Sequence, residues 1–412
     1  MTAAPTEVRR LLVDGVYLQP GFKGVGRYIS RVLERLPEDG SLDMTVLLLA
    51  GTPSDVITPR RHLRVEHVRW RNHLWHGLRV LPALARATKA DALFVPYETP
   101  VAAAGVPLFM VCHDVPSLLR AAGEPGRAQR LLGAVDDNLT ARTLRRAEAV
   151  FSNSEFVAAW LGGSVGLDRD KVHLARCAPG ADYAALAGEV DVAAVRARLD
   201  APDGYILAIS TGPRQENFEI VPAIYDLVRA AGHTLPLVVL GPRDSQLASV
   251  RKTLDGSRHR SDTRIVPFVD GNDAFAMAEI YASATLYLDP SLQEGFGMQV
   301  VEAMACGTPV VCSNRGALPE IVGAGGLLGA PTAADLAPLV CRLLGDAHLR
   351  LELSRTAASQ SGRFSWDTTA EVIRQVITSS LDSRRQPAPA LGCSPAAAAT
   401  PTDPSTATRS SE

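Results

Sequence analysis

Two carboxylates flank a glycine-bearing turn within residues 286–311, and their spacing suits a ligand that carries hydroxyl and phosphate groups. Glu294 stands just before Gly295 and Gly297, and Glu302 lies inside the apolar run that follows. The free N–H groups and the positive dipole end at the start of a helix attract phosphates. Ionised carboxylates accept hydrogen bonds from sugar or ribose hydroxyls. A capped turn with one satisfied glutamate explains the same residues, so the spacing alone leaves both interpretations open.

The elements around these carboxylates form a strand, a loop, a helix and a second strand. The apolar run 284–288 stops at Asp289-Pro290, because proline cannot continue a central strand. We expect a helix over 298–305 that ends at Gly307, where a left-handed cap favours glycine. The apolar run 309–312 predicts a buried strand. Such a unit belongs to a parallel α/β sheet.

The same alternation of strands and helices occupies most of the chain. In the first half, strands are expected near residues 11–13, 44–50, 92–96, 107–112 and 149–152. From Tyr205 the pattern restarts, with strands near 205–210, 235–240, 265–268 and 325–328. The segment 176–204 predicts the connection between two α/β halves. Two such halves leave a cleft between them, where ligands commonly bind.

Composition indicates an ordinary soluble globular protein and gives no support to several other classes. The chain has 412 residues, 46% hydrophobic and 21% charged, with a formal net charge of −2. This balance gives no reason to expect a nucleic-acid partner. Six cysteines without C-x-x-C spacing predict neither a disulfide framework nor a zinc site. With no signal pattern and no apolar run of membrane-spanning length, we expect a cytoplasmic protein.

The stretch SLQEGFGMQVVEAMACGTPVV, residues 291–311, closely resembles the signature of the group 1 glycosyltransferases, a retaining family with the GT-B fold. The family pattern is Glu-Gly-Phe-Gly, four residues, a second Glu, then Ala-x-Ala-x-Gly-x-Pro-Val-Val. The resemblance implies an α/β protein of two Rossmann-like parallel-sheet domains facing a central cleft. We therefore expect an acceptor-side domain at 1–182 and a nucleotide-sugar-binding domain at 183–363.

Two predictions concern the C-terminal part: the family resemblance predicts a helix, and composition predicts the segment after it. The family has a Phe-Ser-Trp segment, found here from Phe364 to Trp366, that starts a helix crossing back to the first domain. We expect this helix at 364–381. Residues 382–412 consist largely of Pro, Ala, Ser and Thr, which predicts a disordered tail.

The resemblance also implies roles for residues of the signature. Glu294 would hold hydroxyl groups of the donor sugar, and Glu302 would hold the nucleotide ribose. The N–H groups around Phe296, Gly297 and Met298 would meet the diphosphate or the sugar. These residues would form the donor half of an active site.

Two further motifs lie in the first half. GFKGVGRYI contains Gly24 and Gly26, but Ile29 replaces the third glycine of a dinucleotide fingerprint. A phosphate cradle and an ordinary tight turn both remain open, and the family carries a similar Gly-x-Gly-Arg-Tyr near the donor pyrophosphate. His113, followed by Asp114, stands at the carboxyl end of a strand, where open α/β sheets bind ligands. The resemblance places this histidine beside the transferred sugar.

One departure from the family concerns the diphosphate. The family usually has an Arg followed closely by a Lys, and Arg214 matches the first of them. The Lys position holds Gln215 or Glu216, and neither is cationic. Loss of one such group costs roughly 3 kcal/mol of transition-state stabilisation by analogy with oxyanion-hole donors. Either Arg243 or Arg27 replaces it, or the protein is slow or non-catalytic.

Metal-dependent transferases hold a cation with Asp-x-Asp, and this chain has one such triplet, Asp168-Arg169-Asp170. It lies in a polar loop and predicts a turn. The resemblance therefore implies a metal-independent reaction with no cofactor beyond the nucleoside-diphosphate sugar as co-substrate. The diphosphate would leave from the face that the acceptor attacks and would take the acceptor's proton.

The sequence thus favours a hexosyltransferase that uses GDP-mannose, with UDP- and dTDP-sugars open, and an unknown glycan, lipid-linked or small-molecule acceptor. The alternative is a slow or non-catalytic GT-B protein that binds a nucleotide sugar; an isomerase or phosphorylase is a third option. Residues 59–80 carry six arginines, together with Trp70 and Trp75. They predict either a solvated face or a patch for acceptor or peripheral binding at the inner membrane face.

Overall fold

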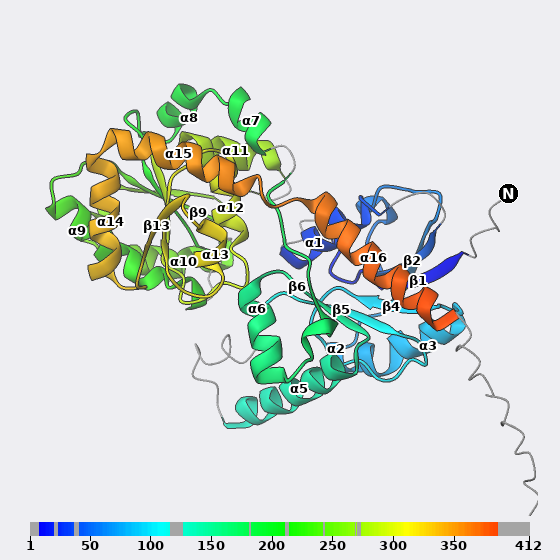
Figure 1. Cartoon of the computed structure of the whole chain (residues 1–412). Helices are drawn as coiled ribbons and strands as arrows, with labels where there is room; N and C mark the ends of the chain where they lie inside the picture. The colour runs from blue at the N-terminus through cyan, green and yellow to red at the C-terminus, as the bar shows by residue number, and fades with distance from the viewer. Residues whose placement is uncertain are drawn as a thin grey trace, which may run out of the picture.

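The computed structural model describes residues 8–19, 24–36, 41–115, 127–180, 183–210, 214–241, 244–267, 269 and 273–385. Two lobes lie side by side, and each contains one sheet covered by helices (Figure 1). Every strand pairing in both sheets is parallel. The predicted fold class, two parallel-sheet Rossmann-like domains, is confirmed.

The first domain has a seven-stranded sheet in the order β3-β2-β1-β4-β5-β6-β7. Leu11 of the central strand β1 faces Met44 on one side and Ala92 on the other. The strands are β1 (Arg9–Asp14), β2 (Leu42–Leu49), β3 (Leu63–Val68), β4 (Ala92–Val95), β5 (Leu108–Cys112), β6 (Ala149–Ser152) and β7 (Val172–Leu174).

Helices cover both faces of this sheet because side chains alternate along each strand. Leu11 and Val13 join the core under α1 (Gly24–Leu33) and α16 (Trp366–Arg385). Leu12 faces the opposite way, into the core under α3 (Leu81–Ala87) and α6 (Glu155–Trp160), with α5 (Arg127–Arg146) alongside.

Three features of this domain differ from what the sequence led us to expect. The sequence leaves a phosphate cradle and a tight turn open at Gly24 and Gly26, but α1 already includes both glycines. The first turn of a helix tolerates glycine, since its N–H groups have no intrahelical partner. Strand β3 escapes prediction because it is an edge strand with Arg64 and Glu66 exposed. Strand β7, at the other edge, has only three partly buried residues.

The second domain repeats the architecture with six strands in the order β10-β9-β8-β11-β12-β13. The strands are β8 (Ile206–Ile209), β9 (Leu237–Leu240), β10 (Thr263–Val266), β11 (Leu286–Asp289), β12 (Val310–Ser313) and β13 (Gly326–Gly329). One face packs against α7 (Tyr183–Glu189), α11 (Ala274–Ser283), α12 (Met298–Ala305) and α15 (Ala347–Ser361). The other face packs against α9 (Val221–Ala230), α10 (Asp244–Leu254) and α14 (Ala333–Gly345).

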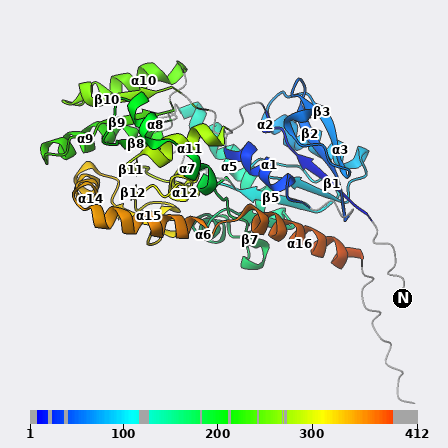
Figure 2. The same cartoon turned by 90° about the horizontal axis from the view of Figure 1, so that it is seen from above.

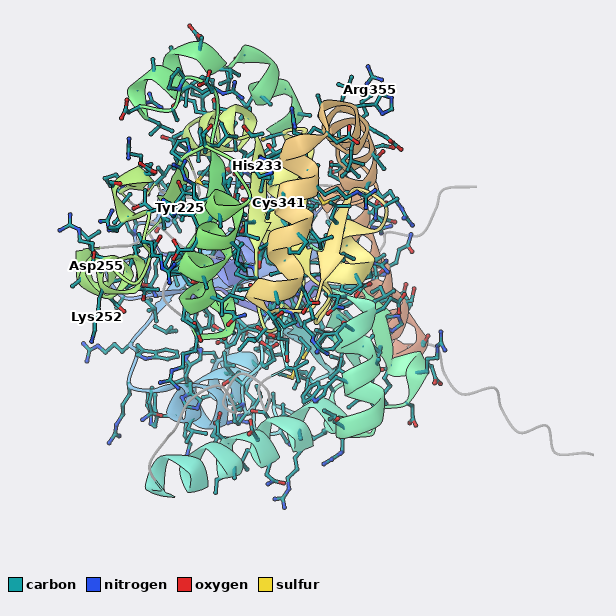
Figure 3. All side chains as sticks on the ribbon, turned by 90° about the vertical axis from the view of Figure 1, so that its left-hand side faces the viewer. Tyr225, His233, Lys252, Asp255, Cys341 and Arg355 are labelled. Carbon is teal, nitrogen blue, oxygen red and sulfur yellow. The ribbon has the colours of Figure 1, made fainter. Side chains whose placement is uncertain are left out.

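Figure 3 faces the outer side of the second domain, where α9 with Tyr225 lies beside α14 with Cys341. Lys252 and Asp255 project from the end of α10 at the edge of this view. The five cysteines in the described part of the chain are unpaired. Among the helices described, none has the length and apolar character that a membrane span requires.

Helix α16 ties the two domains together, as the resemblance implies. Figure 2 shows α15 and α16 following each other along one side of the molecule, from one lobe to the other. Trp366 packs in the core of the first domain, with its ring 5.5 Å from the ring of Tyr28. Near the other end, Asp382 accepts a hydrogen bond from Arg9 Nε at 3.1 Å. The helix continues to Arg385, so the first four residues assigned to the tail are helical, and 386–412 lie outside the described residues.

The strand orders define one switch point in each sheet. The chain reverses direction across the sheet between β1 and β4, and again between β8 and β11. In open α/β sheets, ligands bind outside the carboxyl ends of the strands at this point. We therefore expect a ligand site at the segments that follow these four strands.

Candidate active site

The loop that carries Glu294 follows β11 and is fixed by short hydrogen-bonded turns. Ser291 N donates to Asp289 Oδ1 at 3.0 Å, and Ser291 Oγ lies 3.2 Å from Glu294 Oε1. A Cβ atom on Gly316, whose φ is +60°, would lie 2.4 Å from the Glu294 carbonyl oxygen. That carbonyl accepts a hydrogen bond from Ala317 N at 2.9 Å. The turn before α13 (Leu318–Val322) therefore positions the backbone of Glu294.

Several carboxyl groups meet around Glu294. Burial raises the pKa of Glu294 well above its ordinary value, and the charges of Asp289, Asp114 and Glu216 raise it further. Burial also raises the pKa of Asp289. The pKa of Asp114 is raised to about 6, chiefly by burial, with a further contribution from Glu98. Such a cluster can both donate hydrogen bonds to sugar oxygens, when protonated, and accept them from hydroxyls.

His113 lies one residue beyond β5 and is held at several points. Its Nε2 lies 2.9 Å from the Pro96 carbonyl oxygen, which can only accept, so Nε2 carries the proton. The Tyr28 ring and the imidazole pack in a T-shaped arrangement, with centroids 4.8 Å apart. The Glu98 carboxylate accepts hydrogen bonds from His113 N and from Asp114 N, the latter at 2.8 Å. The ring therefore has a fixed orientation, with Nδ1 as its remaining nitrogen.

The two domains touch where His113 and Glu294 lie. A Cβ atom on Gly295 would lie 2.0 Å from the His113 carbonyl oxygen and 3.2 Å from the Asp114 Cα. Only glycine permits so close an approach of two backbones. This contact brings His113 and Glu294, far apart in the sequence, to the same point of the interface between the domains.

Glu302 lies inside α12 and contacts the other domain through an ion pair. Its side chain is 2% exposed, and its carboxylate pairs with the guanidinium of Arg27 on α1. Tyr281 OH donates a hydrogen bond to Glu302 Oε2 at 3.3 Å. Burial raises the pKa of Glu302, and the Arg27 charge opposes this shift. The sequence assigned Arg27 as a candidate partner of the diphosphate; here its partner is Glu302.

The remaining residues of the signature have structural positions of their own. Phe296 is buried against Phe364, with ring centroids 5.4 Å apart. Gly297 adopts a left-handed φ of +91° and is the residue before α12, which begins at partly buried Met298. The free N–H groups at the start of α12 therefore follow directly after the Glu294 loop.

The glycines of α1 lie in its first turn. A Cβ atom on Gly24 would meet nothing within 4 Å, so no close contact in the described part of the chain requires glycine there. Gly26 is buried. The structure therefore provides a helix start at this place, and whether it holds phosphate is a separate prediction.

The segment after β8 approaches the Glu294 loop from a second side. Leu292 N donates to the Gln215 carbonyl oxygen at 2.7 Å. Asn217, buried with a φ of +53°, donates from Nδ2 to the Pro290 carbonyl at 3.0 Å. Glu216 lies 3.4 Å from Ser210 Oγ and raises the pKa of Glu294, so an acidic group faces the cluster at one of the two positions that can correspond to the family's lysine.

The structure describes only one of the other two arginines that the sequence proposed for the diphosphate. Arg214 is exposed in the turn η5 (Arg214–Glu216), beside the Glu294 loop. Arg243 lies outside the described residues. The triplet Asp168-Arg169-Asp170 is exposed and overlaps the short turn η4 (Arg169–Lys171) before β7, as predicted.

Sequence reasoning missed two carboxylates that organise the interface. Glu98 follows β4 at the switch point, and that position was the signal that could have found it. Glu320 of α13 accepts hydrogen bonds from Glu155 N at 3.1 Å and Phe156 N at 3.0 Å. It thus caps α6 of the other domain. No local sequence pattern predicts such a contact.

Comparison with known proteins finds relatives for both domains. Residues 204–346 match the family described as "Glycosyl transferases group 1", and residues 22–178 match "Glycosyltransferase Family 4". Serotype-specific mannosyltransferase WbdA of Escherichia coli is 26% identical over 284 residues, 67% of this chain and 34% of that protein. D-inositol 3-phosphate glycosyltransferase of Acidothermus cellulolyticus is 30% identical over 297 residues, 68% of this chain and 64% of that protein.

A solved structure supports the fold. Sucrose-phosphate synthase from Thermosynechococcus elongatus superposes with a TM-score of 0.67, at 20% identity, over 91% of this chain and all of that one. At this identity the likeness concerns the fold alone. The chain spans about a third of the length of WbdA, so that protein's whole activity does not transfer to this chain.

Proposed function

The chain is a GT-B protein of the group 1 glycosyltransferases, and we propose that it transfers a hexosyl group from a nucleoside-diphosphate sugar to an acceptor hydroxyl. The observation that carries the proposal is the contact between Gly295 and the His113 carbonyl, which places His113 and Glu294 together between the domains. A transfer between two bound molecules needs such a site, because closing it excludes water that would otherwise take the sugar.

In this proposal the second domain holds the donor. Glu294 accepts hydrogen bonds from sugar hydroxyls, and the start of α12 receives the diphosphate. The ribose hydroxyls bind Glu302 and replace Arg27, whose guanidinium then turns to the diphosphate. Arg27 would thus supply the positive charge that the family's lysine provides elsewhere, while exposed Arg214 approaches from the turn η5.

The reaction we propose is retaining and metal-independent. The bond between the anomeric carbon and the diphosphate oxygen breaks, and a bond to the acceptor oxygen forms on the same face. The departing diphosphate takes the acceptor's proton. His113, with Nε2 committed to the Pro96 carbonyl, presents its other nitrogen beside the sugar.

The finer assignments belong to the same proposal. GDP-mannose is the favoured donor, supported by similarity to a mannosyltransferase; UDP- and dTDP-sugars are the other candidates. We propose a glycan or lipid-linked acceptor of polysaccharide biosynthesis, with a small-molecule acceptor as the other option. A cytoplasmic setting, at or near the inner membrane face, completes the proposal.

The test measures release of nucleoside diphosphate by the purified chain with GDP-mannose, UDP-glucose or dTDP-glucose and a glycan extract as acceptor. We expect turnover with one donor and a loss of at least about a hundredfold in Glu294→Gln, as for other groups that stabilise the transition state. Glu219→Gln, an exposed change in the same domain, serves as the control. Donor binding without turnover by any donor would contradict the proposal and favour a nucleotide-sugar-binding protein.

A further inference from the structure

Two exposed aromatic rings stand at the carboxyl edge of the first sheet, outside the donor site. Tyr17, in the segment after β1, is 43% exposed, and so is Trp70, in the segment after β3. Because all strands of this sheet are parallel, both segments emerge at the edge that also carries His113. Neither ring has a role in the donor-binding scheme above.

Both rings rest on one buried polar triad, formed by Asp14, His76 and Tyr97. Asp14 is fully buried; its Oδ2 lies 3.0 Å from His76 Nε2 and accepts a hydrogen bond from Tyr97 OH. The Tyr17 ring packs on Tyr97 with centroids 4.6 Å apart, in an edge arrangement. The Trp70 ring lies 5.3 Å from the His76 imidazole. Each exposed ring thus has one side fixed by the triad, so it is preorganised.

The segment that brings His76 to Asp14 is anchored by a close backbone contact. His76 opens the π-helical turn η2 (His76–Val80), and a Cβ atom on Gly77 would lie 1.9 Å from the Pro100 carbonyl oxygen. Ala102 N also donates to the Gly77 carbonyl at 3.1 Å. Single π-turns of this kind often accompany functional sites. The loop after β3 is therefore held across the ends of β1 and β4.

Tyr17 lies near one carboxylate of the candidate active site, Glu98. Burial raises the pKa of Tyr17, and the charges of Asp14 and Glu98 raise it further, so Tyr17 lies near both carboxylates. Glu98 is the group that accepts hydrogen bonds from the backbone of His113 and Asp114. A ligand that rests on Tyr17 would therefore extend toward Glu98, which holds the backbone of His113.

We propose that Tyr17 and Trp70 form an acceptor subsite that binds a carbohydrate ring. The C–H faces of a sugar stack on aromatic rings, and its hydroxyl groups bond to neighbouring oxygens such as Glu98 and the Tyr17 hydroxyl. The inference rests on the proposed transfer reaction, for which it names the acceptor class. The acceptor would then place a sugar ring at this subsite. That ring would belong to a free glycan or to the glycan part of a lipid-linked molecule.

A membrane surface is the other partner that the neighbouring arginines suggest. Insertion into lipid requires side chains that project freely, as in interfacial anchors. Tyr17 and Trp70 instead have one side packed on the triad, and this arrangement suits stacking on a flat ligand. The observations therefore favour the sugar, and lipid binding becomes an outcome of the test.

The experiment measures saturation-transfer NMR signals of two probes, α-1,2-mannobiose and maltose, in the presence of the full chain. We expect signals for at least one probe, reduced roughly three- to tenfold in Trp70→Ala and Tyr17→Ala. Trp70→Phe, which keeps a ring, should retain most of the signal. Phe275→Ala removes an equally exposed ring, 42%, from α11 of the other domain and should change nothing. A thermal-shift control checks that the variants are folded. Each variant should be stabilised as much as the wild type by the nucleoside diphosphate that the transferase assay identifies. GDP is used if that assay identifies none.

Two outcomes would overturn the inference: no signal with either sugar, or equal signals in the wild type and both alanine variants. Binding to anionic lipid vesicles that is lost in Trp70→Ala, with no sugar signal, would assign the rings to a membrane surface. Failure of the acceptor subsite can be distinguished from failure of the transfer reaction. Sugar signals that depend on Trp70, in a protein that releases no nucleoside diphosphate, would defeat the proposed reaction and leave a sugar-binding subsite.

Discussion

The guanidinium of Arg27, on α1 of the first domain, pairs with the carboxylate of Glu302, on α12 of the second. The carboxylate is 2% exposed and the arginine side chain 14% exposed, so the pair is largely shielded from water. It joins α12, whose start the proposal assigns to the diphosphate, to the arginine that the proposal moves to that diphosphate. The ion pair thus links the two domains beside the proposed donor site.

Arg27→Ala should strongly destabilise the protein, because it leaves a buried charge without its partner. Removing one member of a buried pair costs about 3–5 kcal/mol. The double variant Arg27→Ala/Glu302→Gln should recover part of this loss, since the glutamine carries no charge. Urea unfolding of the four members of the cycle measures both effects.

The control for this cycle is Arg31→Ala on the same helix. Arg31 pairs with Glu34 at 3.1 Å, with both side chains about a third exposed, and such pairs contribute about 0–1 kcal/mol. Equal destabilisation by Arg27→Ala and Arg31→Ala would show that the cross-domain pair has no special weight.

Gly295→Ala should push the two domains apart. The added methyl group would lie 2.0 Å from the His113 carbonyl oxygen, and backbone atoms cannot yield as a flexible side chain can. We expect a loss of about 1–3 kcal/mol in stability, as for other overpacked sites, and a large fall in nucleoside-diphosphate release.

Gly163→Ala is the matched control, because a Cβ atom there meets nothing within 4 Å. Thermal unfolding and the release assay should show this variant close to wild type. A Gly295→Ala protein with full activity would mean that the contact with His113 does not organise the site.

Asp114→Asn should stabilise the protein at neutral pH but not in acid. Burial and the Glu98 charge raise the pKa of Asp114 from 3.8 to about 6, so the folded state binds more protons than the unfolded state between about pH 4 and pH 6. Stability attributable to this group is therefore present below about pH 4 and is lost as the pH rises through 6. A shift of about two units corresponds to at most about 3 kcal/mol.

The measurement is unfolding by urea at several pH values for both proteins. The asparagine can keep the acceptor that Val115 N uses at 2.9 Å, so the local turn survives. We expect the variant to gain over wild type by about 1–2 kcal/mol at pH 7.5, half of the upper bound, and nothing at pH 4. A gain that does not vary with pH would contradict the assignment.

Glu216→Lys should strengthen donor binding. The Glu216 charge helps to raise the pKa of Glu294, and a lysine would lower it and add a cation near the proposed diphosphate position. Reversal of a charge in a partly buried site contributes more than about 1.4 kcal/mol, which is a tenfold change in affinity. Titration calorimetry with the donor that shows turnover measures the effect.

Glu219→Lys carries the same charge reversal on an exposed position of the next turn and should alter affinity little. Weaker donor binding in Glu216→Lys than in Glu219→Lys would show that the acidic residue has a role of its own in this protein.

Local patterns account for the elements that build the site. The helix predicted over 298–305 is α12 to the residue, and Gly307 has the left-handed φ, +73°, that its place after a helix requires. Strand β5 was also predicted. It is buried on both faces, so its sequence is a continuous apolar run that is visible locally. Edge strand β3 was missed because its exposed side chains remove that signal.

Sequence by itself determined the alternation of strands and helices in two halves, the Glu294 loop and helix α12, because short-range backbone chemistry and apolar patterning specify them. Only the tertiary structure decided which distant residues meet. It placed His113 against Gly295, paired Arg27 with Glu302 and brought Glu98 beneath the backbone of His113. These contacts join residues more than a dozen, and in two cases more than a hundred, positions apart. These contacts arise from domain packing, which local sequence propensity does not predict.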